Sequence, residues 1–153
     1  MMNNLHPGQM CADLEQLWHQ NFPLAKAMGL KAENFTDHCL TTSAPLVLNT
    51  NIHGTAFAGS LYSTLAMTAW GLLHLEIQVA GLEGSIIHAD GNIDFFKTIQ
   101  TDIVAVASFT DHLDSIEELR DTGKTRLTLT TVVEDGDTVL CQFSGSYLAR
   151  LNR

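Results

Sequence analysis

An uninterrupted apolar stretch is the feature that most limits how this chain can fold. Residues 57–75 contain no Asp, Glu, Lys or Arg, so a helix formed by them must be surrounded by lipid or by protein. These nineteen residues would span about 28 Å as a helix, barely the hydrocarbon core of a bilayer. No Lys or Arg flanks the stretch, and Glu76 follows it directly. The sequence therefore predicts a helix buried inside protein, with no membrane partner.

The segments around this helix have the patterns of short helices and of strands. Residues 12–20 place apolar side chains on one helical face, and Pro23 begins a second short helical piece. Gly81 and Gly84 are expected to end the long helix. Strands are predicted over residues 38–48, 85–97, 102–110, 124–134 and 137–149.

Finer patterns complete the predicted fold. Asp135-Gly136 predicts a hairpin turn, and the polar residues 111–123 predict a loop or a helical turn. In 85–97, alternation predicts one face with Ile87, Ala89, Ile93 and Phe95 and an opposite polar face with His88, Asp90, Asn92 and Asp94. We expect one α+β domain over 1–153, an antiparallel sheet wrapped around one long central helix. Residues 1–20 are expected to form an amino-terminal helix and tail.

Composition argues against several functions. The formal net charge is −9 and no run of Lys or Arg occurs, so a nucleic-acid partner is not expected. The seven His are scattered without an HxxxH or HxH pair, so no metal site is expected. Residues 1–10 lack a basic segment followed by an apolar run, which leads us to expect no signal peptide and a cytoplasmic location.

An apolar helix that follows an Asn/Gly loop, with strands after it, resembles the hotdog fold. The stretch Asn51-Ile52-His53-Gly54-Thr55-Ala56-Phe57-Ala58-Gly59-Ser60-Leu61 resembles the thioesterase-like family named for the carboxy-terminal domain of the YiiD proteins. The resemblance covers about residues 20–150 and is most specific over 51–71. In that family an acetyltransferase domain often precedes this one, but the sequence lacks the Q/R-x-x-G-x-G/A loop that binds acetyl-CoA, so acetyl transfer is not expected.

The resemblance implies a substrate class and an assembly. Hotdog domains usually pair their sheets across a two-fold axis, so we expect a homodimer or tetramer with sites between subunits at the start of the central helix. They act on acyl thioesters of coenzyme A or acyl carrier protein. Coenzyme A or phosphopantetheine is then part of the substrate, and no other cofactor is expected.

Four residues of the loop and first helical turn are the candidate catalytic residues. Gly59 lets a substrate approach backbone N–H groups that can stabilise an oxyanion. Asn51 could orient a carbonyl or a water, or it could only shape the loop through an Asx-turn. Ser60 could donate a hydrogen bond to the thioester, and His53 could act as a base or donor. The candidate substrate-binding residues are Gly54, Phe57, Ala58, Leu61, Met67, Asp90, Asp94 and Lys97.

The departures from common hotdog thioesterases leave three functions open. Aligned with them, Met67 replaces their acidic residue, and no carboxylate occurs over 46–75. Decarboxylation of a malonyl thioester, which would feed fatty-acid synthesis, is narrowly favoured because it needs oxyanion donors but no base. Hydrolysis would need Asp90, Asp94 or His53 in place of the missing acid. A non-catalytic acyl-binding module is the third possibility.

An acidic carrier protein would need a local basic surface on this acidic chain. Lys97, Lys124, Arg126 and Arg150 are the candidates, because they fall at or near predicted strand ends. The alternative is that these four residues are ordinary solvated surface charges.

Overall fold

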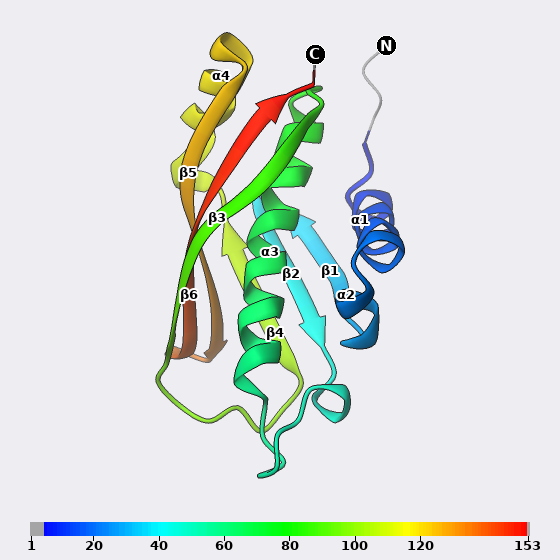
Figure 1. Ribbon diagram of the computed structural model, residues 1–153, viewed down its shortest axis with the longest axis vertical. Coiled ribbons are helices and arrows are strands. Elements are labelled where there is room, and N and C mark those ends of the chain that lie inside the picture. The colour runs from blue at the N-terminus through cyan, green and yellow to red at the C-terminus, as the bar shows by residue number, and fades with distance from the viewer. Residues whose placement is uncertain (1–4, 153) are drawn as a thin grey trace.

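The computed structural model describes residues 5–152, which form one curved antiparallel sheet around a long helix (Figure 1). The sheet has six strands in the order β1-β2-β4-β5-β6-β3. The strands are β1 (Lys31–Thr36), β2 (Cys39–Ala44), β3 (Gly84–Phe95), β4 (Ile103–Ser108), β5 (Lys124–Asp135) and β6 (Thr138–Leu151). The helices are α1 (Pro7–Asn21), α2 (Pro23–Ala27), α3 (Ala58–Val79) and α4 (Leu113–Thr122), with 3₁₀ turns at Leu46–Leu48 and Thr110–His112. This arrangement is the predicted α+β hotdog architecture.

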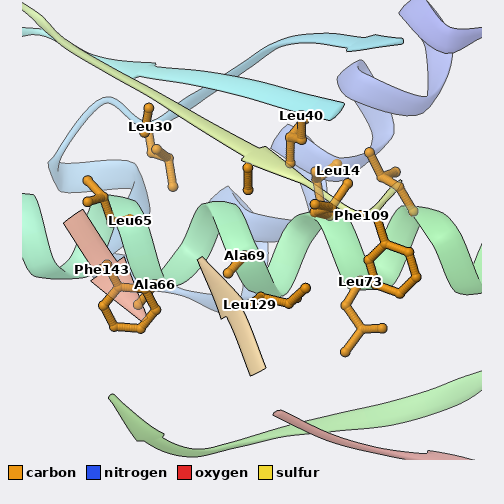
Figure 2. Packing of buried hydrophobic residues seen from close by; sticks show 14 of the residues in the cluster. Leu14, Leu30, Leu40, Leu65, Ala66, Ala69, Leu73, Phe109, Leu129 and Phe143 are labelled. Carbon is orange, nitrogen blue, oxygen red and sulfur yellow. The ribbon is translucent and has the colours of Figure 1, made fainter. Parts of the chain in front are cut away.

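The apolar stretch forms α3, and the sheet wraps it (Figure 1). Figure 2 shows core side chains on both sides of the helix, with Leu30 and Leu40 on one side and Phe143 and Leu129 on the other. Gly81, in the left-handed conformation (φ 71°), ends the helix as predicted. Within residues 5–152 no helix is apolar over a sufficient length to span a bilayer.

One stripe of α3 is not covered by the sheet. Ser63, Met67, Trp70 and His74 recur at three- and four-residue spacing and are half-buried. In Figure 1 this helix is seen between β3 on one side and α1 and α2 on the other. Trp70 stacks on His74, with ring centroids 5.3 Å apart, and burial lowers the pKa of His74. Phe22, between α1 and α2, contacts Trp70 with ring centroids 5.6 Å apart, so the single chain covers this mixed stripe only in part.

The structure differs from the sequence prediction in several elements. α1 begins at Pro7, and residues 1–4 of the predicted tail lie outside the described part. The strand predicted over 38–48 ends at Ala44, where Pro45 leads into a 3₁₀ turn. β1 was not predicted, because only Phe35 of its six residues is fully buried. Residues 113–122 form a true helix, α4, whose left-handed Gly123 (φ 81°) caps it.

A β-bulge in β3 makes the predicted division of its faces wrong for the residues before it. His88 pairs with Tyr147, but Asp90 pairs with the next residue, Ser146, so the bulge at residue 89 shifts the alternation by one. His88 consequently lies on the inner face with Tyr147, while Ile87 points outward and is 55% exposed. After the bulge, the inner face carries Gly91, Ile93 and Phe95, as predicted.

Candidate functional site

The amino end of α3 presents backbone N–H groups that the helix itself does not use. The first hydrogen bond of the helix runs from Leu61 N to Phe57 O, at 3.0 Å. Phe57 is the residue before the helix and has an extended backbone (φ −71°, ψ 133°). No side chain accepts a hydrogen bond from the amides of the first helical turn. The amides of Ala58, Gly59 and Ser60 therefore have no acceptor among residues 5–152, and the positive end of the helix dipole lies there. Such a group of donors suits an oxyanion or a carboxylate.

The ring of Phe57 lies directly over Gly59. A Cβ on Gly59 would lie 2.5 Å from Phe57 Cε1 and 2.8 Å from its Cζ. The ring, which is 51% exposed, thus folds back over the Cα of Gly59. Because this ring is the outer end of a side chain rather than backbone, it can move aside. Phe57 is therefore placed to cover or uncover the first turn of α3.

The loop before α3 is held by a side chain that was expected to contact substrate. Asn51 Nδ2 donates to Thr55 Oγ1 at 2.8 Å, and Asn51 Oδ1 accepts from the amides of His53 at 2.9 Å and Thr55 at 3.2 Å. Both ends of the amide group are therefore used inside the loop, the geometry of an Asx-turn. The loop is tied to the fold by Ala56 N, which donates to Ile99 O at 2.8 Å.

These contacts predict that Asn51 acts by positioning the start of α3. Asn51→Ala should reduce kcat/KM by about 10-fold or more, because several loop hydrogen bonds are worth roughly 1 kcal/mol each. Thr55→Val removes the hydroxyl that Asn51 contacts but leaves Asn51 bonded to the amides of His53 and Thr55, so it should cause a smaller loss, of about fivefold. Steady-state kinetics on both variants test this. Full activity in Thr55→Val beside an inactive Asn51→Ala would instead indicate that Asn51 contacts the substrate.

The structure brings together only part of the predicted site. Gly54 (φ 73°) and the exposed His53 lie in the loop beside Phe57 and the three amides. Leu61 is 4% exposed and belongs to the core, so little of its side chain is available to a substrate. Met67 lies two turns further along α3, on the half-buried stripe.

The carboxylates proposed as substitutes for the missing acid point away from α3. Asp90 and Asp94 pair with Ser146 and Gln142 and share the outer face of the sheet. Asp90 Oδ1 accepts from Ser146 N at 3.1 Å, and its Oδ2 lies 3.5 Å from Arg126. Neither carboxylate therefore reaches the amino end of α3 within its own chain.

The basic residues divide between the two ends of the molecule. Lys97 follows β3 and is exposed. Its backbone N–H donates to Leu140 O at 3.1 Å. Lys124 and Arg150 face each other across β5 and β6, with Arg126 nearby, where β5 begins and β6 ends. In Figure 1 this region is at the opposite end of the molecule from the start of α3. Of these four residues, Lys97 is the one that lies toward the candidate site.

Two hollows lie near the other end of α3. They have volumes of about 220 and 670 Å³ and share the lining residues His38 and Val79. The smaller one contains Glu76, whose carboxylate oxygens lie 2.9 and 3.0 Å from His38 Nδ1. No group of three or more His, Cys, Asp or Glu within residues 5–152 is placed to hold a metal ion.

The sequence from residue 11 to 151 matches the family described as "Putative thioesterase (yiiD_Cterm)". The chain belongs to this family. A Shewanella oneidensis protein solved as a putative thioesterase has 29% identity and a TM-score of 0.85, with 94% of this chain and 99% of that chain covered. A Chlorobaculum tepidum protein of unknown function has 26% identity and a TM-score of 0.89, with 97% and 98% covered. A probable thioesterase of Pseudomonas aeruginosa, at 20% identity and a TM-score of 0.74 over 92% and 95%, supports the fold alone.

Proposed function

We propose that this protein binds acyl thioesters at the amino end of α3 and hydrolyses them. The observation that carries the proposal is the set of three unpaired amides, Ala58 to Ser60, at the uncapped start of a buried helix in a family described as putative thioesterases. Attack on a thioester carbonyl places negative charge on its oxygen. Donors fixed before the reaction stabilise that charge, and one such donor is worth about 10²–10³-fold in rate.

The side chains around the amides have defined parts in this proposal. Gly59 allows the carbonyl to approach the backbone, and the Ser60 hydroxyl supplies a further donor in the first turn. Phe57 covers the bound acyl group, and Met67 extends an apolar path along the half-buried stripe of α3. Coenzyme A or a carrier-bound phosphopantetheine carries the acyl group, and Lys97 is available to a phosphate.

A second copy of the chain is proposed to complete the site. β3 lies at one edge of the sheet with its outer side unpaired in the single chain. Ile87, Phe95 and Phe96 at or near this edge are 55%, 50% and 58% exposed, which is unfavourable in water. Pairing of two β3 strands would cover this edge and the open stripe of α3 beside it. The protein is therefore expected to be a homodimer, or a tetramer built from such dimers.

Malonyl-thioester decarboxylation is the second candidate reaction, and one observation favours it. No charged side chain occurs over residues 57–75, and Asp90 and Asp94 face outward. The unpaired amides could stabilise the enolate left by carbon dioxide without a base.

The two reactions differ in their products. The protein would be incubated with acetyl, malonyl and longer acyl thioesters of coenzyme A and of acyl carrier protein, with mass spectrometry and a thiol reagent as readouts. Hydrolysis releases a free thiol from the acyl substrates. Decarboxylation lowers the mass of the malonyl substrate alone and releases no thiol. Saturable binding without either change would contradict both reactions and support a binding module.

A further inference from the structure

A histidine and a tyrosine meet beside β3, outside the loop that the proposed function uses. A Cβ placed on Gly91 would collide with Tyr62 Oη and would stand 3.1 Å from His88 Nε2. The hydroxyl of Tyr62, from α3, and the imidazole of His88, from β3, therefore share the space that Gly91 leaves free. Gly91 also pairs with Gly145 of β6, and the ring of Phe143 lies over both glycines.

The bulge and the aromatic neighbours orient the imidazole of His88, which remains exposed to solvent in the single chain. Because the bulge follows His88, its ring lies on the inner face and stacks on Tyr147, with centroids 4.6 Å apart and planes 13° apart. The Phe143 ring packs edge-on with the rings of His88 and Tyr62, with ring centroids 5.7 Å and 5.3 Å apart, respectively. β-Bulges commonly re-aim a side chain near a site.

The hydrogen bonds leave two polar atoms of this pair without partners. His88 Nε2 lies 2.7 Å from Asp90 O, and a carbonyl only accepts, so Nε2 carries the proton and Nδ1 keeps a free lone pair in the neutral ring. Tyr62 Oη has no hydrogen-bond partner among residues 5–152. Tyr147, by contrast, uses its hydroxyl in a bond to Ala66 O at 2.8 Å.

Tyr62 follows the free amides closely along α3. It is three residues after Gly59 and four after Ala58, so it lies one turn further along the helix. Tyrosine side chains on helices lean toward the amino end, which brings the phenol toward those amides. Tyr62 thus connects the first turn of α3, which carries the amides, with the imidazole of β3.

We propose that His88 is the general base of the hydrolysis and that Tyr62 holds the attacking water beside it. This rests on the proposed function. His88 Nδ1 takes a proton from the water as the water oxygen bonds to the carbonyl carbon, and the carbonyl π electrons move to the oxygen held by the amides. When the C=O bond re-forms, the C–S bond breaks, and the thiolate takes the proton from the imidazolium. One thioester and one water thus give one carboxylic acid and one thiol.

The experiment compares variants with matched controls. His88→Ala should lose about 10²-fold or more in kcat for thiol release, because general-base catalysis is worth roughly that much, and added imidazole should restore part of it. Tyr62→Phe should lose about 10-fold and keep its thermal midpoint. His112→Ala removes an imidazole that contacts Phe109 and lies outside this pair, and it should leave kcat within about twofold.

The outcomes separate this inference from the proposed function. Thiol release by the wild-type protein together with unchanged kcat in folded His88→Ala and Tyr62→Phe would overturn the inference alone. A loss in His88→Ala that imidazole does not restore, with a lowered thermal midpoint, would show a structural role and also overturn it. A wild-type protein that releases no thiol would overturn the proposed function and the inference with it.

Discussion

Trp18→Ala is expected to lower the free energy of unfolding by about 3–5 kcal/mol. Trp18 of α1 is 0% exposed, and it is the largest of the fully buried side chains. Its ring packs on Gly71 of α3, where a Cβ would lie 2.5 Å from Trp18 Cζ2 and 3.0 Å from Leu14 Cδ2. Truncation would leave a cavity between α1 and α3 that backbone on both sides prevents from closing. Chemical denaturation followed by circular dichroism measures the loss.

Trp18→Phe is the control for this prediction. Trp18 Nε1 is buried without a hydrogen-bond partner among the described residues, so Phe removes an unsatisfied donor as well as part of the ring. The cost should therefore be less than half that of Trp18→Ala. Equal losses in the two variants would show that the docking of α1 does not depend on filling this volume.

His38→Ala is expected to destabilise the protein by about 2 kcal/mol at pH 8 and by clearly less at pH 5. Glu76 is 3% exposed, and the imidazole of His38 is its hydrogen-bond partner. Burial raises the pKa of Glu76, and His38 opposes that rise. Removing His38 leaves a buried carboxylate without a partner, which costs a few kcal/mol when both groups of a pair are buried. Because His38 is 42% exposed, we expect a smaller loss of stability.

The direction of the pH dependence follows from the raised pKa. A carboxyl whose pKa is higher in the folded state than in the unfolded state stabilises the fold at low pH. That stability is lost as the pH rises through the folded value. His38→Ala should thus lose stability, relative to wild type, from about pH 5 upward. In the double variant His38→Ala, Glu76→Gln, the additional pH dependence should disappear. A loss in His38→Ala that is equal at pH 5 and pH 8 would contradict this account.

Periodicity was sufficient to predict the elements that are regular throughout. Residues 57–75 are apolar on nearly all sides because the sheet surrounds α3, and β5 alternates exposed and buried residues from Lys124 to Thr131, although the register with β6 shifts at Val133/Glu134 beside the Asp135-Gly136 turn. The same reasoning missed β1, which is polar because it lies at an edge of the sheet. It also missed α4, although Gly123 after an acidic, amphipathic segment was a usable helix-end signal.

The geometry of the candidate site could be anticipated where it depends on the backbone and not where it depends on strand register. The free amides of α3 follow from a glycine-containing helix start without a capping residue. The inner position of His88 depends on a bulge, and no local sequence signal at residue 89 distinguishes a bulge from regular alternation. The contacts of Asn51 likewise depend on how the loop closes, and only the Asx-turn alternative anticipated them.

The most direct measurement compares the two ends of α3 in one experiment. The ¹⁵N-labelled protein would be titrated with an acyl-coenzyme A analogue in which a methylene replaces the sulfur, so that the carbonyl remains but cannot be hydrolysed. The account predicts saturable shifts of the amide resonances of Ala58, Gly59 and Ser60, with little change at His38 and Val79. Shifts confined to His38 and Val79, beside the hollows at the other end of the helix, would contradict it.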